Sequence, residues 1–290
     1  MSRPNFDRLA PPPRSLPLGL RALALFGPPL GLAGWVLLAF TSPFVWAFVL
    51  NADLLSPVLF RGDVDRVEGR VTSARETGAS EGDVPVHAVG YSYRGPDGAD
   101  LDGVSYVTGG PPAVGAAVTV EYLTLRPLTS RIQGMRSATF GPGAGFVVIF
   151  PALGALLAGL GLRSGLRRLR LLRSGQAGAA EFVSQEGTSM EINDRPVFRL
   201  IFEFAGTDGL RHRVSQTTTD PQGLRDERRE TVLFHPENPD HAVLVDSLPA
   251  AVVADEQGQL AARGAAGLAL LLPLLTVLGN ASCAAYRFLR

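Results

Sequence analysis

Two closely spaced histidines give the strongest chemical signal in this 290-residue chain. His235 and His241 flank the segment Pro-Glu-Asn-Pro-Asp, so Glu237 or Asp240 would add an oxygen ligand to two nitrogen ligands for a divalent metal. The spacing matches no established ligand pattern, and the two prolines equally indicate a rigid turn between strands. We therefore favour the turn, and a metal-dependent hydrolase remains only the third hypothesis.

No other combination of residues predicts catalysis. The glycine-rich run at 141–145 lacks the Lys and the Ser or Thr of a phosphate-binding loop. Its single cysteine, Cys283, excludes an intrachain disulfide and a cysteine-based zinc site. We predict no catalytic residue, no metal site and no cofactor, and we expect a protein that is not an enzyme.

A cluster of arginines is the second candidate site. Five arginines follow an apolar segment within eleven residues, without an acidic residue among them, and leucines alternate with them as in a helix at a lipid surface. Such arginines can contact anionic lipid headgroups, at about 1 kcal/mol for each cation. The alternative is a collar of charge that only sets the membrane orientation. The candidate headgroup contacts are Arg163, Arg167, Arg168, Arg170 and Arg173.

The charge of the whole chain is balanced. It has 27 basic and 27 acidic residues, which gives a formal net charge of zero. Nucleic-acid binding usually needs a strongly basic face, so a nucleic-acid partner is disfavoured. Every basic residue is arginine, which is typical of a bacterial genome rich in G and C.

Three apolar segments separate two polar stretches and indicate a membrane protein. Each segment has about the 20 uncharged residues that a helix needs to cross ~30 Å of hydrocarbon. Small residues one turn apart, such as Ala155 and Gly159, predict close helix contact. We predict transmembrane helices at 23–50, 141–162 and 264–286, a disordered basic N-terminus at 1–22 and a basic juxtamembrane helix at 163–175.

The arginine distribution predicts the orientation in the membrane. Arginines precede the first apolar segment and follow the second, whereas Asn51 and Asp53 open the first polar stretch. Cytoplasmic flanks retain arginine, so we expect a cytoplasmic N-terminus, a first polar domain outside and a second polar domain in the cytoplasm of a bacterium. Arg287 and Arg290 conflict with three spans, which place the C-terminus outside.

The two polar stretches, 61–136 and 176–248, are similar to each other. An offset of 111 residues pairs Tyr91 with Phe202 and aligns the Asp-Gly pairs that begin at 97 and 208. Apolar residues alternate with period two, and Asp-Gly suits tight turns between antiparallel strands. We predict two small β domains, barrels or sandwiches, of about five strands each. In the first copy the strands are expected near 67–75, 86–94, 101–108, 117–123 and 129–133.

Both copies follow one order of motifs: Gly-x-Val, then aromatic-x-aromatic before an Asp-Gly turn, then Val-x-aromatic-x-Pro-x-Asn-Pro. The opening motif is complete in the first copy, at Gly69 and Val71, whereas Ala180 takes the valine position in the second. Thr124 and Arg126 replace the Pro and Asn of the closing motif in the first copy. This order resembles the bacterial membrane-associated domain-of-unknown-function family 3592, in two tandem copies over about half the chain. The resemblance implies a small β domain joined to membrane helices, and it implies no reaction. The second copy has the complete closing motif, at Val232, Phe234, Pro236, Asn238 and Pro239.

The sequence thus predicts an α+β membrane protein with three transmembrane helices and two similar antiparallel β domains. Our first hypothesis is a non-enzymatic multi-pass protein of the bacterial plasma (inner) membrane. Its β domains would bind other proteins or envelope components, since an exposed sheet edge can accept an added strand. The alternative is an accessory or sensory subunit of a transport or signalling complex. The expected partners are the lipid bilayer and other membrane or envelope proteins.

Overall fold

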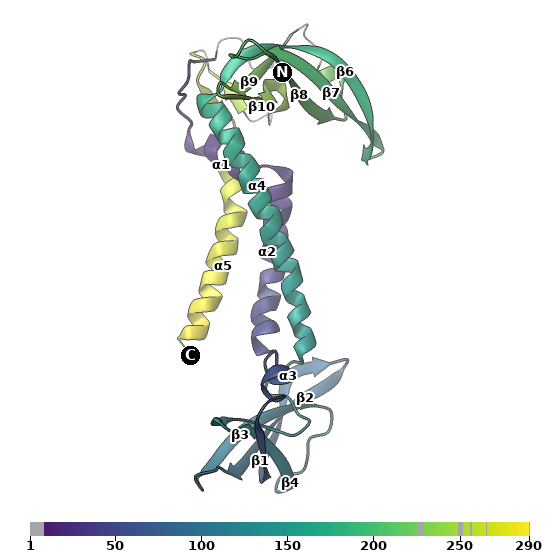
Figure 1. Ribbon diagram of the computed structural model, residues 1–290, viewed down its shortest axis with the longest axis vertical. Coiled ribbons are helices and arrows are strands. Elements are labelled where there is room, and N and C mark those ends of the chain that lie inside the picture. Colours follow the sequence, from purple (N-terminus) through teal and green to yellow (C-terminus); the bar gives the residue numbers. More distant parts are fainter. Residues whose placement is uncertain (1–8, 225–228, 249–251, 256, 265, 290) are drawn as a thin grey trace. The chain divides into compact units, whose positions relative to one another are not determined.

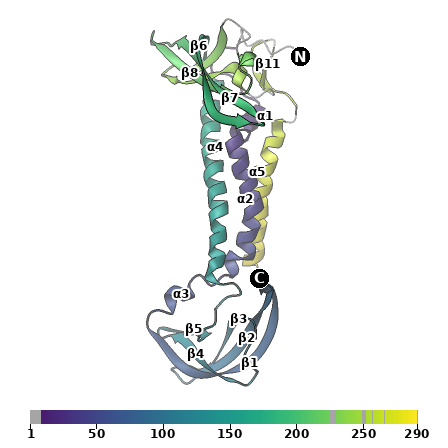
Figure 2. The same ribbon diagram turned by 90° about the vertical axis from the view of Figure 1, so that its right-hand side faces the viewer.

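The computed structural model describes residues 9–224, 229–248, 252–255, 257–264 and 266–289. This part of the chain forms five α-helices, two five-stranded antiparallel sheets and one two-stranded sheet (Figures 1 and 2). The predicted α+β class and the two antiparallel sheets are confirmed. The chain divides into two compact units, one of residues 1–39 and 153–282, the other of residues 40–152 and 283–290.

Three helical segments are long and apolar enough to cross a membrane, as the sequence predicts. Their sides carry many exposed leucine, valine and phenylalanine residues, a surface that is costly in water and suits lipid. Each segment joins a 3-10 turn to an α-helix. The segments are Pro29–Asn51, with α2 (Pro29–Ala47) and η1 (Val49–Asn51); Pro142–Ser174, with η2 (Pro142–Val148) and α4 (Ile149–Ser174); and Ala266–Phe288, with η5 (Ala266–Leu270) and α5 (Leu271–Phe288).

Helices α2 and α4 approach each other closely through glycine. A Cβ atom added to Gly34 would lie 2.3 Å from the backbone nitrogen of Ala158 and 2.7 Å from the backbone oxygen of Gly154. The sequence-based prediction of contact through Ala155 and Gly159 is wrong within this chain, because both residues are exposed. Each follows a contact residue by one position, which turns it about 100° around the helix and away from α2.

The predicted disorder of residues 1–22 is wrong from residue 9 onward; residues 1–8 lie outside the described part. Helix α1 spans Leu18–Phe26, and Leu16 and Leu20 are buried with Ala24 in one hydrophobic cluster. Leu20 and Ala24 are four residues apart and share one face of α1, whereas Leu16 precedes the helix. Arg21 lies between Leu20 and Ala24, so a prediction based on charge alone overlooks this apolar face. We call residues 9–26 the N-terminal segment.

The first β domain is a sheet with the strand order β3-β2-β1-β4-β5, and its long strand β1 is strongly curved (Figure 2). Its edges meet, because the Ile132 N–H donates to Ser105 Oγ, and Tyr106 and Arg136 exchange backbone hydrogen bonds. The sheet therefore closes toward a barrel around Tyr91 and its neighbours. The strands are β1 (Val64–Glu81), β2 (Val84–Arg94), β3 (Asp100–Thr108), β4 (Ala117–Leu123) and β5 (Arg126–Ile132), and the short helix α3 (Ser56–Leu59) precedes them.

The second β domain repeats this order as β8-β7-β6-β9-β10. The irregularities repeat too, since β1 shifts register between Val71 and Ser73 and β6 shifts between Phe182 and Ser184, at the same offset of 111 residues. Such shared bulges support the predicted duplication. The strands are β6 (Gln176–Ile192), β7 (Arg195–Ala205), β8 (Arg211–Thr218), β9 (Glu230–His235) and β10 (Asn238–Leu244), with η3 (Gln222–Leu224) between β8 and β9.

A second hydrophobic core covers the outside of the second β domain. It continues beyond residue 248, where the prediction ended this domain, through the small hairpin of β11 (Val252–Ala254) and β12 (Leu260–Ala262). The turn η4 (Val245–Ser247), the N-terminal segment and Leu172 of α4 complete it around Leu233. This core holds the end of α4 against the second β domain.

Candidate anion-binding site

One face of α4 carries three arginines toward the second β domain. Arg163, Arg167 and Arg170 are spaced by four and three residues, so they share one side of the helix. With His235 and His241 they line a cavity of about 460 Å³, which we call the arginine–histidine pocket. The other lining residues are Leu166, Leu171, Glu237 and Asn238.

The charge of the arginine–histidine pocket is strongly positive. Its three guanidinium groups face one carboxylate, that of Glu237. None of these arginines takes part in an ion pair with another residue of the described chain. Three positive charges on one face repel one another, so a negatively charged ligand between them is favourable.

The hairpin between β9 and β10 positions both histidines. It turns tightly, since His235 ends β9 and Asn238 starts β10, and Thr207 Oγ1 donates a 2.8 Å hydrogen bond to the backbone oxygen of Pro236. The backbone N–H of Glu237 donates to His235 Nδ1 at 3.3 Å. In the neutral imidazole Nε2 then carries the proton, so His235 also presents a donor.

A third histidine anchors the same hairpin from β8. His212 Nδ1 lies 3.1 Å from Asp240 Oδ1, and His212 Nε2 lies 2.9 Å from Asp208 Oδ2. The hydrogen bonds of the Asp240 and Asp208 carboxylates raise the pKa of His212 above its usual value. With a carboxylate at each ring nitrogen, the imidazolium form of His212 donates both hydrogen bonds. It thereby ties the β7–β8 turn to the first residues of strand β10.

The chemistry of the arginine–histidine pocket suits a phosphate or carboxylate better than a metal cation. Guanidinium groups bind phosphate with two parallel N–H donors, and the leucine side chains offer apolar contact beside them. A volume of about 460 Å³ falls within the range of about 300–1,000 Å³ typical of small-molecule sites. Within the described ranges no three His, Cys, Asp or Glu residues are grouped to hold a metal ion, and the neighbouring arginines would repel one.

The structure divides the predicted arginine cluster into separate groups. Arg163, Arg167 and Arg170 lie together, whereas Arg173 lines a second groove of about 410 Å³ with Arg14 and Arg21 of the N-terminal segment. Arg168 is half-buried and lines neither cavity. The sequence predicts the arginines and the histidines as separate candidates and does not predict that they line one pocket. The four- and three-residue spacing was the available signal for the helix face.

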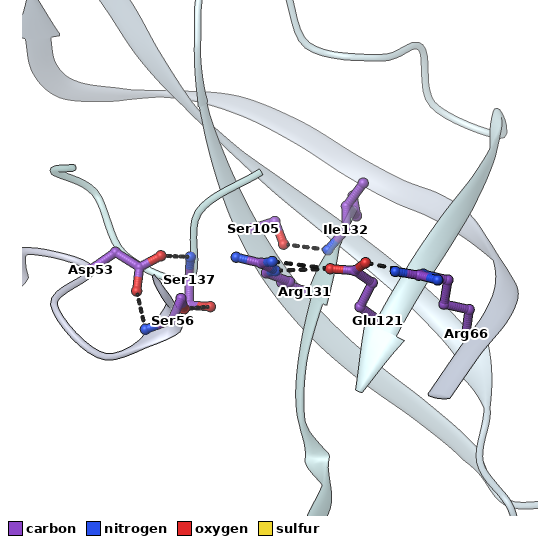
Figure 3. Close-up of polar contacts among 8 residues, drawn as sticks. All are labelled: Asp53, Ser56, Arg66, Ser105, Glu121, Arg131, Ile132 and Ser137. Atoms are coloured by element: carbon purple, nitrogen blue, oxygen red, sulfur yellow. Dashed lines mark hydrogen bonds and ion pairs between the residues drawn. The ribbon is translucent and has the colours of Figure 1, made fainter. Parts of the chain in front are cut away.

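The first β domain also concentrates charge, but there the charges neutralise one another (Figure 3). Glu121 accepts hydrogen bonds from Arg66 at 3.2 Å and from Arg131 at 3.1 Å. The carboxylate of Asp53 accepts the backbone N–H groups of Ser56 at 3.1 Å and of Ser137 at 2.8 Å. These contacts connect strands and loops, so we assign this cluster to folding and not to ligand binding.

No protein-family model, curated protein or solved structure matches this chain.

Proposed function

We propose that this protein is a non-enzymatic membrane protein that binds the phosphate of an anionic lipid headgroup in the arginine–histidine pocket. The observation that carries this proposal is the pairing of three arginines on one face of α4 with two histidines of the β9–β10 hairpin. Because these arginines lie in the last part of the span Pro142–Ser174, directly after its uncharged residues 142–162, the pocket would open at the level of the headgroups. Cavity size and charge both support a phosphate-bearing ligand.

The arrangement in the membrane is part of the same proposal. We place the N-terminus and the second β domain in the bacterial cytoplasm and the first β domain outside, because arginines collect before the first span and after the second. The inner leaflet is rich in anionic lipids, which matches the positive pocket. We also propose, on motif order alone, that both β domains belong with domain-of-unknown-function family 3592.

Binding of short-chain lipids and of inorganic phosphate to the full chain tests the proposal. We expect the purified protein in neutral detergent to bind short-chain phosphatidylglycerol and to show little affinity for phosphatidylcholine. Inorganic phosphate distinguishes recognition of a lipid from recognition of any phosphate. Charge-assisted hydrogen bonds contribute about 1.5–3 kcal/mol each, so Arg167→Gln with Arg170→Gln should weaken phosphatidylglycerol binding by at least tenfold.

Arg173→Gln is the matched control, because it removes an arginine of the same helix end that lines the other groove. We expect a change of less than threefold. Equal losses from the pocket variants and from Arg173→Gln would contradict a specific pocket and favour the alternative of a charge collar. Binding of inorganic phosphate as tight as that of the lipid would show that the lipid is not the ligand.

Protein binding through an added strand is the second proposal, and the structure makes it more demanding. In the first domain the edge strand β3 is bridged by the Tyr106–Arg136 hydrogen bonds, and in the second domain His212 joins β8 to β10. A partner strand would have to displace these contacts. An accessory or sensory subunit remains the alternative, and exchange of the first β domain should then alter the partners of the second.

A further inference from the structure

We infer that α3 and the tip of the β4–β5 hairpin contact the surface of the lipid bilayer, as a shallow membrane anchor of the first β domain. The contact surface, which we call the apolar rim, consists of Leu55 at the N-cap of α3, Val58 and Leu59 within α3, and Leu125 and Leu128 from the hairpin. This inference shares with the proposed function only the insertion of the apolar helices. It does not depend on the arginine–histidine pocket.

The apolar rim is unusually exposed for residues of its kind. Leu125 is 94 % exposed and Val58 is 69 % exposed, and the other three residues also rank among the exposed large apolar side chains. Single exposed leucines are ordinary, but several on two neighbouring elements mark an interaction surface. Each apolar side chain moved from water into lipid contributes about 25 cal/mol for each Å² that it buries.

Backbone hydrogen bonds hold α3 at the place where the apolar spans begin and end. The Asp53 N–H donates to Phe140 O at 2.8 Å, and the Phe140 N–H donates to Asn51 O at 3.0 Å. Asn51 is the last residue of the first span and Pro142 is the first residue of the second. The Asp53 carboxylate fixes the start of α3 by accepting the Ser56 N–H. Helix α3 therefore lies beside the membrane boundary of both spans.

Strand pairing brings the hairpin tip to the same end of the first β domain. Val64, five residues after α3 ends, pairs with Leu123, the last residue of β4. The Thr124 N–H donates to Asp63 O, so Leu125 follows directly at the tip. Both parts of the apolar rim thus lie next to the segment that joins α3 to β1.

The chemistry around the apolar rim fits lipid as its occupant. Arg61 and Arg126 are exposed on either side, and arginines beside apolar residues can keep their charge among the headgroups while their stems lie on the acyl chains. The rim also begins only four residues after Asn51, the last residue of the first apolar span. In the second copy the equivalent β9–β10 turn carries Glu237 in place of Leu125, and Glu237 lines the arginine–histidine pocket.

Site-specific fluorescence in bilayers tests this inference. In the full chain with Cys283→Ser, single variants Leu125→Cys and Val58→Cys are labelled with the environment-sensitive dye NBD. The protein is placed in nanodiscs of phosphatidylcholine and phosphatidylglycerol. We expect blue-shifted emission at both sites, with quenching by headgroup-attached nitroxide lipids at least twofold stronger than at Val114→Cys.

Val114 is a matched control because it is apolar and 64 % exposed but lies far from α3. Its neighbour Gly115 donates its N–H to Val71 O, seven residues along β1 from Val64, or about 20 Å. Phe40→Cys, within the first span, reports insertion itself. Quenching at Phe40 without quenching at Leu125 and Val58 would overturn the inference and leave the proposed function intact. A blue shift without lipid quenching would mean that protein covers the rim, and would overturn it as well.

Discussion

The two β domains share one strand order but differ on the outer face of the same three strands. In the first domain that face carries an ion-pair ladder, and in the second it carries apolar residues. Strand pairing makes the positions directly comparable. Glu121 is the central residue of one row across three paired strands, and Leu233 is the central residue of the equivalent row in the second domain. The compared positions are Arg66, Glu121 and Arg131 in the first domain and Ala177, Leu233 and Val243 in the second.

This difference gives the outer faces of the two domains different roles, although both sheets have the same strand order. The Glu121 side chain is only 6 % exposed, but Arg66 is 61 % exposed, so the first domain presents its ladder to water. Leu233 instead lies in one hydrophobic cluster with Leu16 and Leu20 of the N-terminal segment and Leu172 of α4. The second domain thereby holds the end of α4, and with it the arginine face of the pocket.

The largest expected effect on stability comes from placing glutamate, the central residue of the first outer face, at the central position of the second. Leu233→Glu would bury a carboxylate with no cationic partner in an apolar cluster, and we expect a loss of at least about 4 kcal/mol in the free energy of unfolding. Urea unfolding of the full chain in detergent would measure this loss. Hydrogen exchange would assign it to the second domain and to residues 9–26.

The reverse exchange, Glu121→Leu, should cost less. It removes hydrogen bonds to charged groups, but Arg66 is already mostly in water, so we expect a loss of about 1–2 kcal/mol. Equal losses for the two variants would mean that the outer faces contribute alike, and the comparison would then be wrong.

The N-terminal segment has no counterpart in the first domain, and Arg14 is its main polar anchor. Arg14 is 4 % exposed and donates to the backbone oxygens of Ala10 at 2.6 Å, Gly175 at 2.8 Å and Leu172 at 3.3 Å. Two of these carbonyls belong to the C-terminal end of α4, where a positive charge is favourable. Arg14→Met should therefore cost about 2–3 kcal/mol, measured as faster proteolysis within residues 9–17.

Arg21→Met is the control, because the guanidinium of Arg21 donates one hydrogen bond, to Leu16 O. We expect less than about 1 kcal/mol for this variant. If both variants expose the N-terminal segment equally, its attachment depends on the leucines and not on the cap of α4.

Periodicity made much of the fold predictable from sequence. The five predicted strands of the first copy overlap β1 to β5, because period-two alternation and Asp-Gly turns act locally. Gly98 and Gly209 have φ values of 81° and 76°, as the turns require. The apolar helices were predicted for a similar reason, since length and composition suffice to recognise them.

The features that the sequence did not predict are contacts between segments far apart in the chain. Leu233 looks like any outward residue of a half-buried strand, and only its burial against Leu16 and Leu260 reveals the second core. The helix faces were ambiguous in the same way, since Gly154 and Ala155 are both small and only Gly154 faces α2. The arginine–histidine pocket combines α4 with a hairpin more than 60 residues later, so local patterns could not predict it.

The smallest of the predicted effects is the pH dependence of stability. The stabilisation from the titrating group should be lost at high pH in the second domain and at low pH in the first. In the second domain the Asp240 and Asp208 carboxylates raise the pKa of His212, so the stabilisation is present below the usual histidine pKa and is lost as pH rises through the raised value. In the first domain burial raises the pKa of Glu81, but hydrogen bonds from Thr108, Arg136 and Gly141 outweigh it, and the pKa is lowered. That stabilisation is lost only on acidification, as pH falls through the lowered value.

Hydrogen exchange, corrected for the intrinsic pH dependence of amide exchange, would separate the two responses. Above neutral pH we expect protection to fall at residues 206–213 and at the β9–β10 hairpin, while the first domain stays unchanged. His212→Gln should abolish this change, and Asp240→Asn should reduce it, because a neutral amide then replaces the carboxylate that raises the His212 pKa most. A His212→Gln variant that still loses protection at the hairpin would show that another group titrates there. The hairpin, and with it the position of His235 and His241 in the pocket, would then not depend on the imidazolium of His212.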